Sequence, residues 1–461
     1  MFRLDYLENK KIIFYSYCTL LLGGSFFNGS NSDLLIQLNF IVFACFFLFL
    51  LSIKNYKAHF VYFFRKNKIT ISLYALLLLF IALQMLPLPL SILKHVSPAH
   101  YAITQELDIS FSYYSISLDS KATYFQFLNF VNFFLIIFCA KIICVNRHDK
   151  SKFYFIVCLI GFIHAFVAIY LYLQGNPPFF LKEVVHYRNS ATGFFINRTN
   201  FAVYLCVIAT TAIYFLFKEK NLDANTKAKK EIINVSVYVR FFLLFISIAM
   251  IASLSKTANF CYAIVILLFL FYSFVENKKF INSFSIFILI LVVVDIFIFG
   301  FYFGSDQLLS RFALLQEELI NTKIGDNITE VSLARFDIVK FSFAQIKSFI
   351  LFGYGLGSYE TVFKLYFNNP GFSFANHAHS DIVEFAGELG LLGSSLIILC
   401  VFSFFQQLYK SRKLYRSLDL FYLFSLILVV MIVMFFDFSY HIPSIQYLTL
   451  ALLSVVTNKQ L

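Results

Sequence analysis

Histidine and acidic side chains gather in one short stretch of the chain, residues 374–393, which reads FANHAHSDIVEFAGELGLLG. Its histidines are His377 and His379, and an imidazole titrates close enough to neutral pH to take a proton from a hydroxyl group. Glu384 and Glu388 follow four residues apart, on one face of a helix. Such carboxylates either orient a catalytic group or form ordinary helix–helix hydrogen bonds. The stretch therefore predicts acid–base chemistry at the start of a helix.

Four basic residues stand at the ends of apolar segments. Arg188 and Arg198 precede one such segment, and Lys256 lies in a short turn between two others. Arg335 opens the amphipathic pattern of residues 332–352. Cations at membrane entrances favour an anionic, lipid-borne substrate, because phosphate groups accept charge-assisted hydrogen bonds. Each cation also has a plainer interpretation, as an interfacial anchor or a solvated charge on an amphipathic helix.

A metal site is the rival interpretation of the histidines. The order His-Ala-His-Ser-Asp resembles an HxHxDH metal motif, but Ile382 stands where the last histidine would be. The remaining histidines show no second ligand cluster in the sequence: His59, His95, His100, His148, His164, His186 and His441. We therefore predict no metal and no other cofactor. Asp295 and the pair Asp437 and His441 are further ionisable residues at or near membrane depth, which marks them as functional candidates.

The composition shows which elements must position these side chains. The chain has 461 residues, of which 60% are hydrophobic and 13% charged, and its mean hydropathy is +0.78. Apolar runs long enough to cross about 30 Å of hydrocarbon recur along the whole length. We predict an all-α polytopic membrane protein with about twelve transmembrane helices. These are 12–28, 34–53, 69–90, 122–144, 153–175, 199–217, 237–254, 257–275, 280–304, 381–409, 419–438 and 443–457.

Basic residues predict the orientation of the chain. They concentrate in the connections 54–68, 146–152, 218–240 and 410–416, which the positive-inside rule places in the cytoplasm together with both termini. The net charge of +12 is then mostly a cytoplasmic collar facing anionic lipid, and no nucleic-acid partner is implied.

Three parts of the chain follow from this topology. Residues 1–304 are predicted to hold transmembrane helices one to nine, and residues 381–461 helices ten to twelve. Between them, residues 305–380 form one large periplasmic loop. The pattern of residues 332–352 predicts an amphipathic helix in this loop, lying on or beside the bundle as a lid.

A family resemblance rests on the spacing around His379. His379-Ser380, nine further residues and then Gly390-Leu-Leu-Gly393 is similar to the signature of the bacterial O-antigen ligase and O-antigen polymerase superfamily. Other segments resemble the same superfamily in the same order: LQMLPLP (83–89), SISLDSKATYFQFLNF (115–130), TGFFINRTNFAVYL (192–205) and FGYGLGSYE (352–360). The glycines of the signature are expected to let a neighbouring segment approach closely.

The resemblance implies a metal-independent glycosyltransferase of the bacterial inner membrane. Such an enzyme moves a glycan from undecaprenyl pyrophosphate to lipid A-core, or to another glycan or protein acceptor, on the periplasmic face. The resemblance implies that His379 is the catalytic base, and from their spacing we predict that Glu384 and Glu388 are catalytic residues that orient His379 or a loop arginine. The resemblance also implies pyrophosphate binding by Arg188, Arg198, Lys256, Arg335 and His377. The family usually has Arg in the turn that holds Lys256, and Lys lacks the bidentate fork of Arg.

Other functions remain open at this stage. An O-antigen polymerase or a protein O-oligosaccharyltransferase of the same superfamily would share most of these features. A lipid-linked glycan transporter or flippase is the alternative of another class. Transporters usually carry charges at the bilayer midplane and internal symmetry between halves, whereas here the charges crowd the membrane boundary.

Overall fold

The computed structural model describes residues 2–107, 111–180, 187–220, 226–278, 281, 284–295, 297, 335–367 and 375–458. In this part of the chain, nine helices are long and apolar enough to cross a membrane. They are α2 (Asp33–Ser52), α4 (Lys68–Met85), α7 (Ser120–Ile143), α8 (Arg147–Leu173), α9 (Arg198–Lys220), α10 (Thr226–Ala252), α11 (Lys256–Asn277), α15 (Asp381–Lys410) and α16 (Ser417–Phe436). The predicted fold class, an all-α polytopic membrane protein, is confirmed.

The other three predicted spans coincide with further helices. The first falls on α1 (Phe2–Gly23), and the last falls on α17 (Pro443–Val456), a shorter apolar helix. The ninth overlaps the short apolar helix Phe284–Asp295. Residues 305–334 and 368–374 of the predicted large loop lie outside the described residues.

Polar residues set where several spans begin. Ser32, Asp119 and Ser255 each accept a hydrogen bond from the backbone N–H three residues further on, at the starts of α2, α7 and α11. Such capping satisfies one of the N–H groups that the first helical turn leaves unbonded. The long apolar runs that follow close their backbone hydrogen bonds internally, as a hydrocarbon environment requires.

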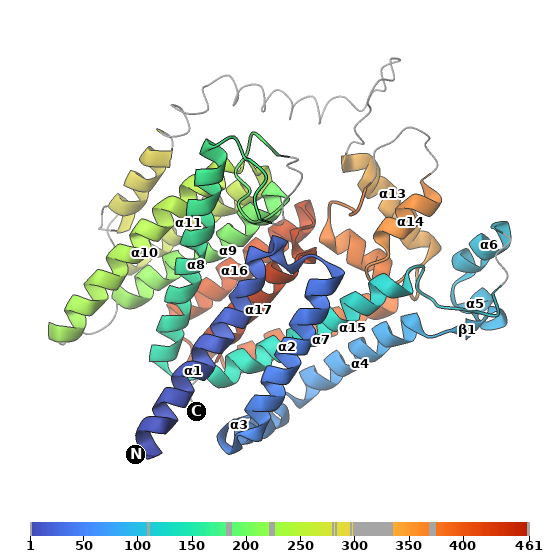
Figure 1. Ribbon diagram of the computed structural model, residues 1–461, viewed down its shortest axis with the longest axis horizontal. Coiled ribbons are helices and arrows are strands. Elements are labelled where there is room, and N and C mark those ends of the chain that lie inside the picture. Colours follow the sequence, from blue (N-terminus) through green and yellow to red (C-terminus); the bar gives the residue numbers. More distant parts are fainter. Residues whose placement is uncertain are drawn as a thin grey trace.

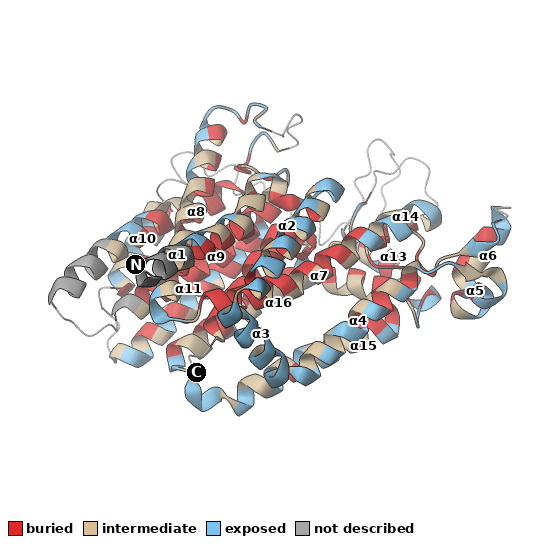
Figure 2. Cartoon of the chain, turned by 60° about the horizontal axis from the view of Figure 1, so that its bottom comes forward, coloured by how far each residue is buried: buried red, intermediate tan, exposed pale blue. Residues whose placement is uncertain are grey.

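Helix α9 forms the centre of the main bundle. It packs against α8, α10, α11 and α16, and every residue from 200 to 217 is buried. A helix that is apolar on all sides belongs in an interior rather than at a surface. Figure 2 shows α9 in red among helices whose outer faces are tan and pale blue.

A second group of helices lies beside this bundle. Helix α15 packs along α4, and α7 joins the group to the bundle through contacts with α2, α4 and α17 (Figure 1). Helix α3 (Lys54–Lys66) connects α2 to α4 and buries none of its residues. Beyond α4 lie α5 (Leu90–Val96), α6 (Pro98–Glu106) and a two-stranded antiparallel pair, β1 (Leu88–Pro89) with β2 (Tyr113–Tyr114).

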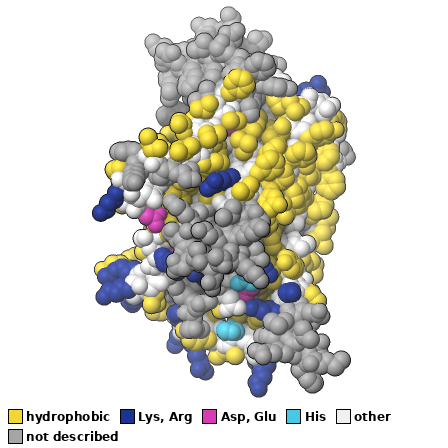
Figure 3. Space-filling model, turned by 90° about the vertical axis from the view of Figure 1, so that its left-hand side faces the viewer, with side chains coloured by type: hydrophobic (Ala, Val, Ile, Leu, Met, Phe, Trp, Pro, Cys, Tyr) yellow, Lys and Arg dark blue, Asp and Glu magenta, His cyan; other side chains and the backbone are white. Residues whose placement is uncertain are grey.

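The exterior is predominantly apolar, as a lipid-facing surface must be. Figure 3 shows hydrophobic side chains covering much of one face of the molecule. Large exposed side chains such as Leu267 and Phe271 on α11, and Ile398 and Phe402 on α15, contribute to this surface. Lipid in place of water explains why a folded chain leaves so many apolar side chains uncovered.

Several contacts gather both ends of the chain at one end of the bundle. Lys10 of α1 forms an ion pair of 2.8 Å with Asp149 of α8, and Lys141 of α7 donates a 2.8 Å hydrogen bond to Thr457 just after α17. The start of α1 and the end of α17 therefore lie on the same side, which agrees with the twelve predicted spans.

A small separate core surrounds the predicted amphipathic helix, which is confirmed as α13 (Arg335–Ser348). Ile338 of α13 is buried with Val362 of α14 (Tyr359–Tyr366) and with Ala375 and Ala378. The last two residues flank His377. The histidine stretch is thus fixed by packing on one side before it enters α15.

Candidate active site

The site begins where α15 starts. The backbone N–H of Asp381 donates to the carbonyl of Asp437 at 3.1 Å, and the hydroxyl of Ser380 donates to the carbonyl of Met434 at 3.3 Å. These bonds fasten the start of α15 to the end of α16. Acidic side chains in the first turn of a helix are also favoured by its exposed N–H groups and dipole.

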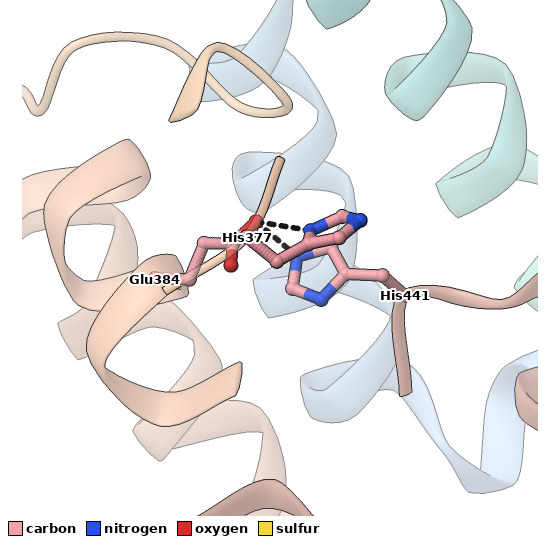
Figure 4. A group of neighbouring side chains, drawn as sticks. All are labelled: His377, Glu384 and His441. Atoms are coloured by element: carbon pink, nitrogen blue, oxygen red, sulfur yellow. Dashed lines mark hydrogen bonds and ion pairs between the residues drawn. The ribbon is translucent and has the colours of Figure 1, made fainter. Parts of the chain in front are cut away.

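Glu384 is the centre of a buried cluster at this helix start (Figure 4). Its Oε1 lies 2.9 Å from Nδ1 of His377 and 3.3 Å from Nε2 of His441, and its Oε2 accepts a 2.7 Å hydrogen bond from the N–H of Ala378. The Glu384 side chain is 2% exposed. Two hydrogen-bond donors and the nearby His441 ring therefore hold one carboxylate that has almost no contact with solvent, which offsets the cost of its burial.

His441 comes from the short turn η4 (Ser439–His441) between α16 and α17. Its Nδ1 hydrogen-bonds Asp381, while its Nε2 faces Glu384. Burial alone would lower the pKa of His441, but the charges of Glu384 and Asp381 and the hydrogen bond to Asp381 outweigh it and raise the pKa to about 10. His441 is therefore an imidazolium at neutral pH.

The cluster contains residue types that can bind a metal, but its side chains contact one another. In the described part of the chain, His377, Glu384 and His441 are the one group of possible ligands whose donor atoms lie within 4.8 Å of one another. The Nδ1 of His441 hydrogen-bonds Asp381 and its Nε2 lies 3.3 Å from Glu384, so both ring nitrogens already face carboxylates. The residues therefore fit a chain of hydrogen bonds better than a metal.

Phe438 positions both histidines of the predicted motif. The His377 ring stacks on it with centroids 4.6 Å apart and an angle of 15°, and the His379 ring meets it edge-on at 5.2 Å. His379 has a φ of +56°, in the left-handed region where most residues with a side chain are rarely found. The two imidazoles are thus presented by a tight bend on one aromatic surface.

Glu388 lies one helical turn deeper than Glu384 and is fully buried. The backbone N–H groups of Gly357 and Tyr359 are directed at its carboxylate without reaching strict hydrogen-bond geometry. The structure therefore places Glu384 in the histidine cluster and Glu388 against the segment that precedes α14.

The glycines of the signature form a break in α15. Gly390 has φ +59° and ψ −167°, which interrupts the helix and frees backbone groups on either side. The glycine-rich segment before α14 pairs with these groups. Four hydrogen bonds join the two: Tyr354 N to Gly387 O (3.1 Å), Gly355 N to Glu388 O (3.1 Å), Leu391 N to Ile350 O (2.8 Å) and Leu392 N to Leu351 O (3.1 Å).

Two more of the family-like segments meet at this break. The side-chain amide of Gln84, in LQMLPLP, donates to the carbonyls of Phe352 and Glu388 at 2.8 and 2.9 Å. Ser117, in SISLDSKATYFQFLNF, donates its N–H to the carbonyl of Gln84 at 2.9 Å, and its hydroxyl lies 3.0 Å from that of Ser358. Segments spread over 300 residues thus support the start of α15.

Three of the four predicted cations lie at or just before the starts of α9 and α11. Arg188 is exposed, and the guanidinium of Arg198 lies 5.3 Å from the centre of the Tyr187 ring at the start of α9. Lys256 is exposed at the start of α11. Arg335 begins α13, and its side chain lies outside what the structure describes.

Two contacts connect the arginine-bearing segment to the other turns. The N–H of Ala191 donates to the carbonyl of Ala252 at 2.8 Å, close to the turn that holds Lys256. A Cβ on Gly29 would touch both Phe195 and Ile442, so the α1–α2 turn is packed between this segment and the end of η4. Arg188, Arg198 and Lys256 therefore lie at the same end of the bundle as His441.

His441 and Asp381 are the site residues that sequence reasoning missed or only touched. His441 was expected to be functional because it is ionisable near membrane depth, but nothing in the sequence linked it to the HAHSD stretch. The expectation that the other histidines form no cluster is corrected, because His441 packs with its ring centroid 5.0 Å from that of His377. The turn between α16 and α17 brings it there from 60 residues beyond Asp381.

The fold and the site together define a polytopic membrane protein with an acid–base cluster at the start of one span. Residues 241–398 match the model of the O-antigen ligase family. The match confirms the resemblance to the O-antigen ligase and polymerase superfamily. It covers Lys256, Arg335, His377, His379, Glu384 and Glu388, and leaves out Arg188, Arg198 and His441. A comparison with curated proteins finds no match.

Proposed function

We propose that the chain is an O-antigen ligase-like glycosyltransferase. It moves a glycan from undecaprenyl pyrophosphate to an acceptor hydroxyl of lipid A-core, on the periplasmic face of the bacterial inner membrane. The observation that carries the proposal is the buried cluster of His377, Glu384 and His441 inside a region that matches the O-antigen ligase family. Both termini and the basic connections are then cytoplasmic.

The reaction needs one base and several fixed cations. The acceptor oxygen forms a bond to the anomeric carbon, the bond from that carbon to the phosphate oxygen breaks, and undecaprenyl pyrophosphate leaves with the electron pair. The acceptor proton passes to an imidazole, a role that the resemblance assigns to His379. Donors for the diphosphate charge come from the basic turns: Arg188, Arg198, Lys256 and Arg335, with His377 beside them. These cations make the reaction metal-independent and cofactor-free.

Two related activities differ from this one only in the acceptor. A polymerase would use a second lipid-linked glycan, and a protein O-oligosaccharyltransferase would use a Ser or Thr hydroxyl. A transporter would leave the glycosidic phosphate bond intact. The cluster at a helix start near the membrane boundary supports bond-breaking chemistry over transport, since transport sites usually lie at the midplane.

The decisive experiment offers the purified protein each acceptor in turn. The protein is reconstituted in liposomes with an undecaprenyl-pyrophosphate-linked glycan and with lipid A-core, a second lipid-linked glycan, a peptide or no acceptor. We expect glycosylated lipid A-core together with free undecaprenyl pyrophosphate, also after exhaustive chelation with EDTA. Movement of intact donor across the bilayer without its cleavage would refute the proposal, and loss of transfer with EDTA that Mg²⁺ restores would refute metal independence.

A further inference from the structure

We propose that Asn176 is a positioning residue for the cations that bind the diphosphate, and that its buried side-chain amide fixes the backbone that carries Arg188. This inference rests on the proposed function, in which Arg188 and Lys256 are two of the residues that stabilise the departing undecaprenyl pyrophosphate. Asn176 does not touch the substrate in this proposal. It acts on the reaction through the place that it gives to Arg188.

Asn176 lies three residues beyond the end of α8. Its N–H donates to the carbonyl of Leu171 at 2.8 Å, and its φ is +52°, in the left-handed region that often follows a helix. Asparagine is one of the few residues with a side chain that adopt this conformation readily. Asn176 is 4% exposed, so its amide is buried and must find its hydrogen-bond partners within the protein.

The partners of this amide are backbone carbonyls around Arg188. Its Nδ2 lies 2.6 Å from the carbonyl oxygen of Arg188, 3.3 Å from that of Tyr187 and 3.0 Å from that of Ser190. Carbonyl oxygens only accept hydrogen bonds, so the NH₂ group of the amide is the part that faces them. The carbonyls of Tyr187 and Arg188 belong to the two peptide groups that flank the Cα of Arg188. One side chain therefore fixes the backbone on both sides of this arginine.

Position 176 makes two demands that asparagine meets together. The backbone needs a left-handed conformation, and the carbonyls need a neutral donor on a short side chain. Glycine would keep the backbone but has no amide. Aspartate would keep the shape, but its ionised carboxylate would place acceptors against acceptors. The loss of this one NH₂ group is therefore enough to release the carbonyls around Arg188.

The segment that Asn176 holds is also joined to the turn that carries Lys256. The N–H of Ala191 donates to the carbonyl of Ala252, the last residue of α10, and Ser255 then caps α11, whose first residue is Lys256. Residues 190–193 are buried, whereas Arg188 and Lys256 are exposed. The backbone is thus held in the protein while two cationic residues lie at its surface.

A fixed backbone lowers the cost of binding a diphosphate. An arginine side chain loses rotamer freedom when it binds a phosphate group, and a backbone that also had to be ordered would add to this loss. With its two flanking peptide groups held by Asn176, Arg188 has only its side chain to order. Removal of the Asn176 amide should therefore weaken the interaction with the donor although the guanidinium is still present.

The test is a double-mutant cycle on the reconstituted full-length protein, with an undecaprenyl-pyrophosphate-linked glycan as donor and lipid A-core as acceptor. Arg188→Ala should lower kcat/KM for the donor by about 10- to 100-fold, the usual loss of a charge-assisted partner. Asn176→Gly keeps the left-handed backbone and removes the amide. It should lower kcat/KM for the donor by about 10-fold, as for coupled neighbours, and leave the KM for the acceptor unchanged.

The second half of the cycle shows whether Asn176 acts through Arg188. In the Arg188→Ala background, Asn176→Gly should change kcat/KM for the donor by no more than about 2-fold, because there is no guanidinium left to position. Thermal unfolding of each variant in detergent identifies those that fold. If Asn176→Gly does not fold, Asn176→Asp takes its place in the cycle, since it has nearly the same shape and no NH₂ group.

Asn28 offers a matched control at the other end of the same segment. It also has a positive φ, +49°, and its Oδ1 accepts a 2.8 Å hydrogen bond from the N–H of Ile196. Asn28→Gly therefore removes an asparagine contact from this segment without touching the peptide groups of Arg188. Any change that it causes in kcat/KM should be the same in the wild-type and Arg188→Ala backgrounds.

Two results would overturn the inference. One is an unchanged kcat/KM for the donor in folded Asn176→Gly. The other is an equal fall in the wild-type and Arg188→Ala backgrounds, which would give Asn176 the same general supporting role as Asn28. In both cases the wild type still transfers glycan. Absence of transfer by the wild type would refute the proposed function itself, so the two failures are distinguishable.

Discussion

His441 should make the folded protein less stable as the pH becomes alkaline. Its pKa is raised from 6.5 to about 10 in the folded state by Glu384 and Asp381, against the effect of burial. A group with a raised folded pKa binds its proton more tightly when folded. Its stabilising contribution is therefore complete below about pH 6.5, the unfolded value, and is lost as the pH rises through about 10.

We predict that the melting temperature of the wild type in detergent falls between pH 7 and pH 10 more steeply than that of His441→Gln. The variant cannot gain or lose this proton, so its curve should lack that part of the slope. Thermal unfolding monitored by fluorescence across this pH range provides the measurement. Parallel curves for the two proteins would show that His441 is not charged in the folded state.

Arg198 offers a residue-scale test of the diphosphate site. A charge-assisted hydrogen bond contributes about 1.5–3 kcal/mol, so Arg198→Ala should reduce kcat/KM for the lipid-linked donor by about 10- to 100-fold. Arg198→Lys should recover only part of this loss if the guanidinium binds two phosphate oxygens. Initial rates at varied donor concentration measure both. Unchanged kcat/KM in Arg198→Ala would leave this arginine as an interfacial anchor stacked near Tyr187.

At this scale, the sequence could indicate local pairs but not distant ones. Glu384 and the two histidines stand within eight residues, so their proximity follows from chain connectivity and helix geometry. That Glu384 contacts His377 follows from the bend at His379, whose backbone conformation is not encoded in any residue pattern. The contact between Asp381 and His441 depends on how α16 and α17 return to the start of α15.

Gly353 and Gly390, which approach each other at the break in α15, allow a prediction about how two elements pack. A Cβ on Gly353 would overlap the carbonyl of Glu388, and a Cβ on Gly390 would overlap the backbone N of Gly353. Both glycines also have positive φ. We predict that Gly353→Ala lowers the melting temperature in detergent and the yield of folded protein, because rigid backbone atoms cannot yield to the added methyl group.

Two other glycines serve as matched controls for this measurement. Gly175 has φ +77° with no atom within 4 Å of an added Cβ, so Gly175→Ala should cost only the conformational strain of about 1 kcal/mol. Gly23 has neither a positive φ nor a close neighbour, and Gly23→Ala should be nearly neutral. Equal melting temperatures for Gly353→Ala and Gly175→Ala would contradict the close approach of the two segments.

The helices could be predicted from the sequence more readily than the break within α15. Spans such as α2 and α16 follow from apolar length alone, and α13 follows from its amphipathic pattern. The break at Gly390 does not, because a single Gly in an apolar helix is compatible with an unbroken helix as well. Only the approach of the segment around Gly353 from 37 residues earlier gives the freed backbone groups their partners.

For the whole molecule, composition decided the class of protein, and basic residues predict its orientation. The start of α1 and the end of α17 lie on one side of the bundle, where Lys10 and Lys141 make their polar contacts. Packing brings the two ends to one side, and the distribution of Lys and Arg determines whether that side is the cytoplasm or the periplasm. The orientation also determines which side of the membrane the site faces, and donor and acceptor must approach from that side.

We predict that the side with both ends of the chain is the cytoplasm. Fusions truncated after Phe60, Asn225 and Leu414 should carry a fluorescent protein that matures in the cytoplasm, and fusions after Ser110 and Ser190 should carry active periplasmic phosphatase. The reason is the high density of Lys and Arg in 54–68, 218–240 and 410–416, which resist translocation. Since truncation can itself alter insertion, single cysteines placed at the same positions in the full-length chain should be labelled with impermeant maleimide in matching fashion. Periplasmic signal after Asn225 would invert the orientation and place the His377 cluster on the cytoplasmic face, where the proposed acceptor is not expected.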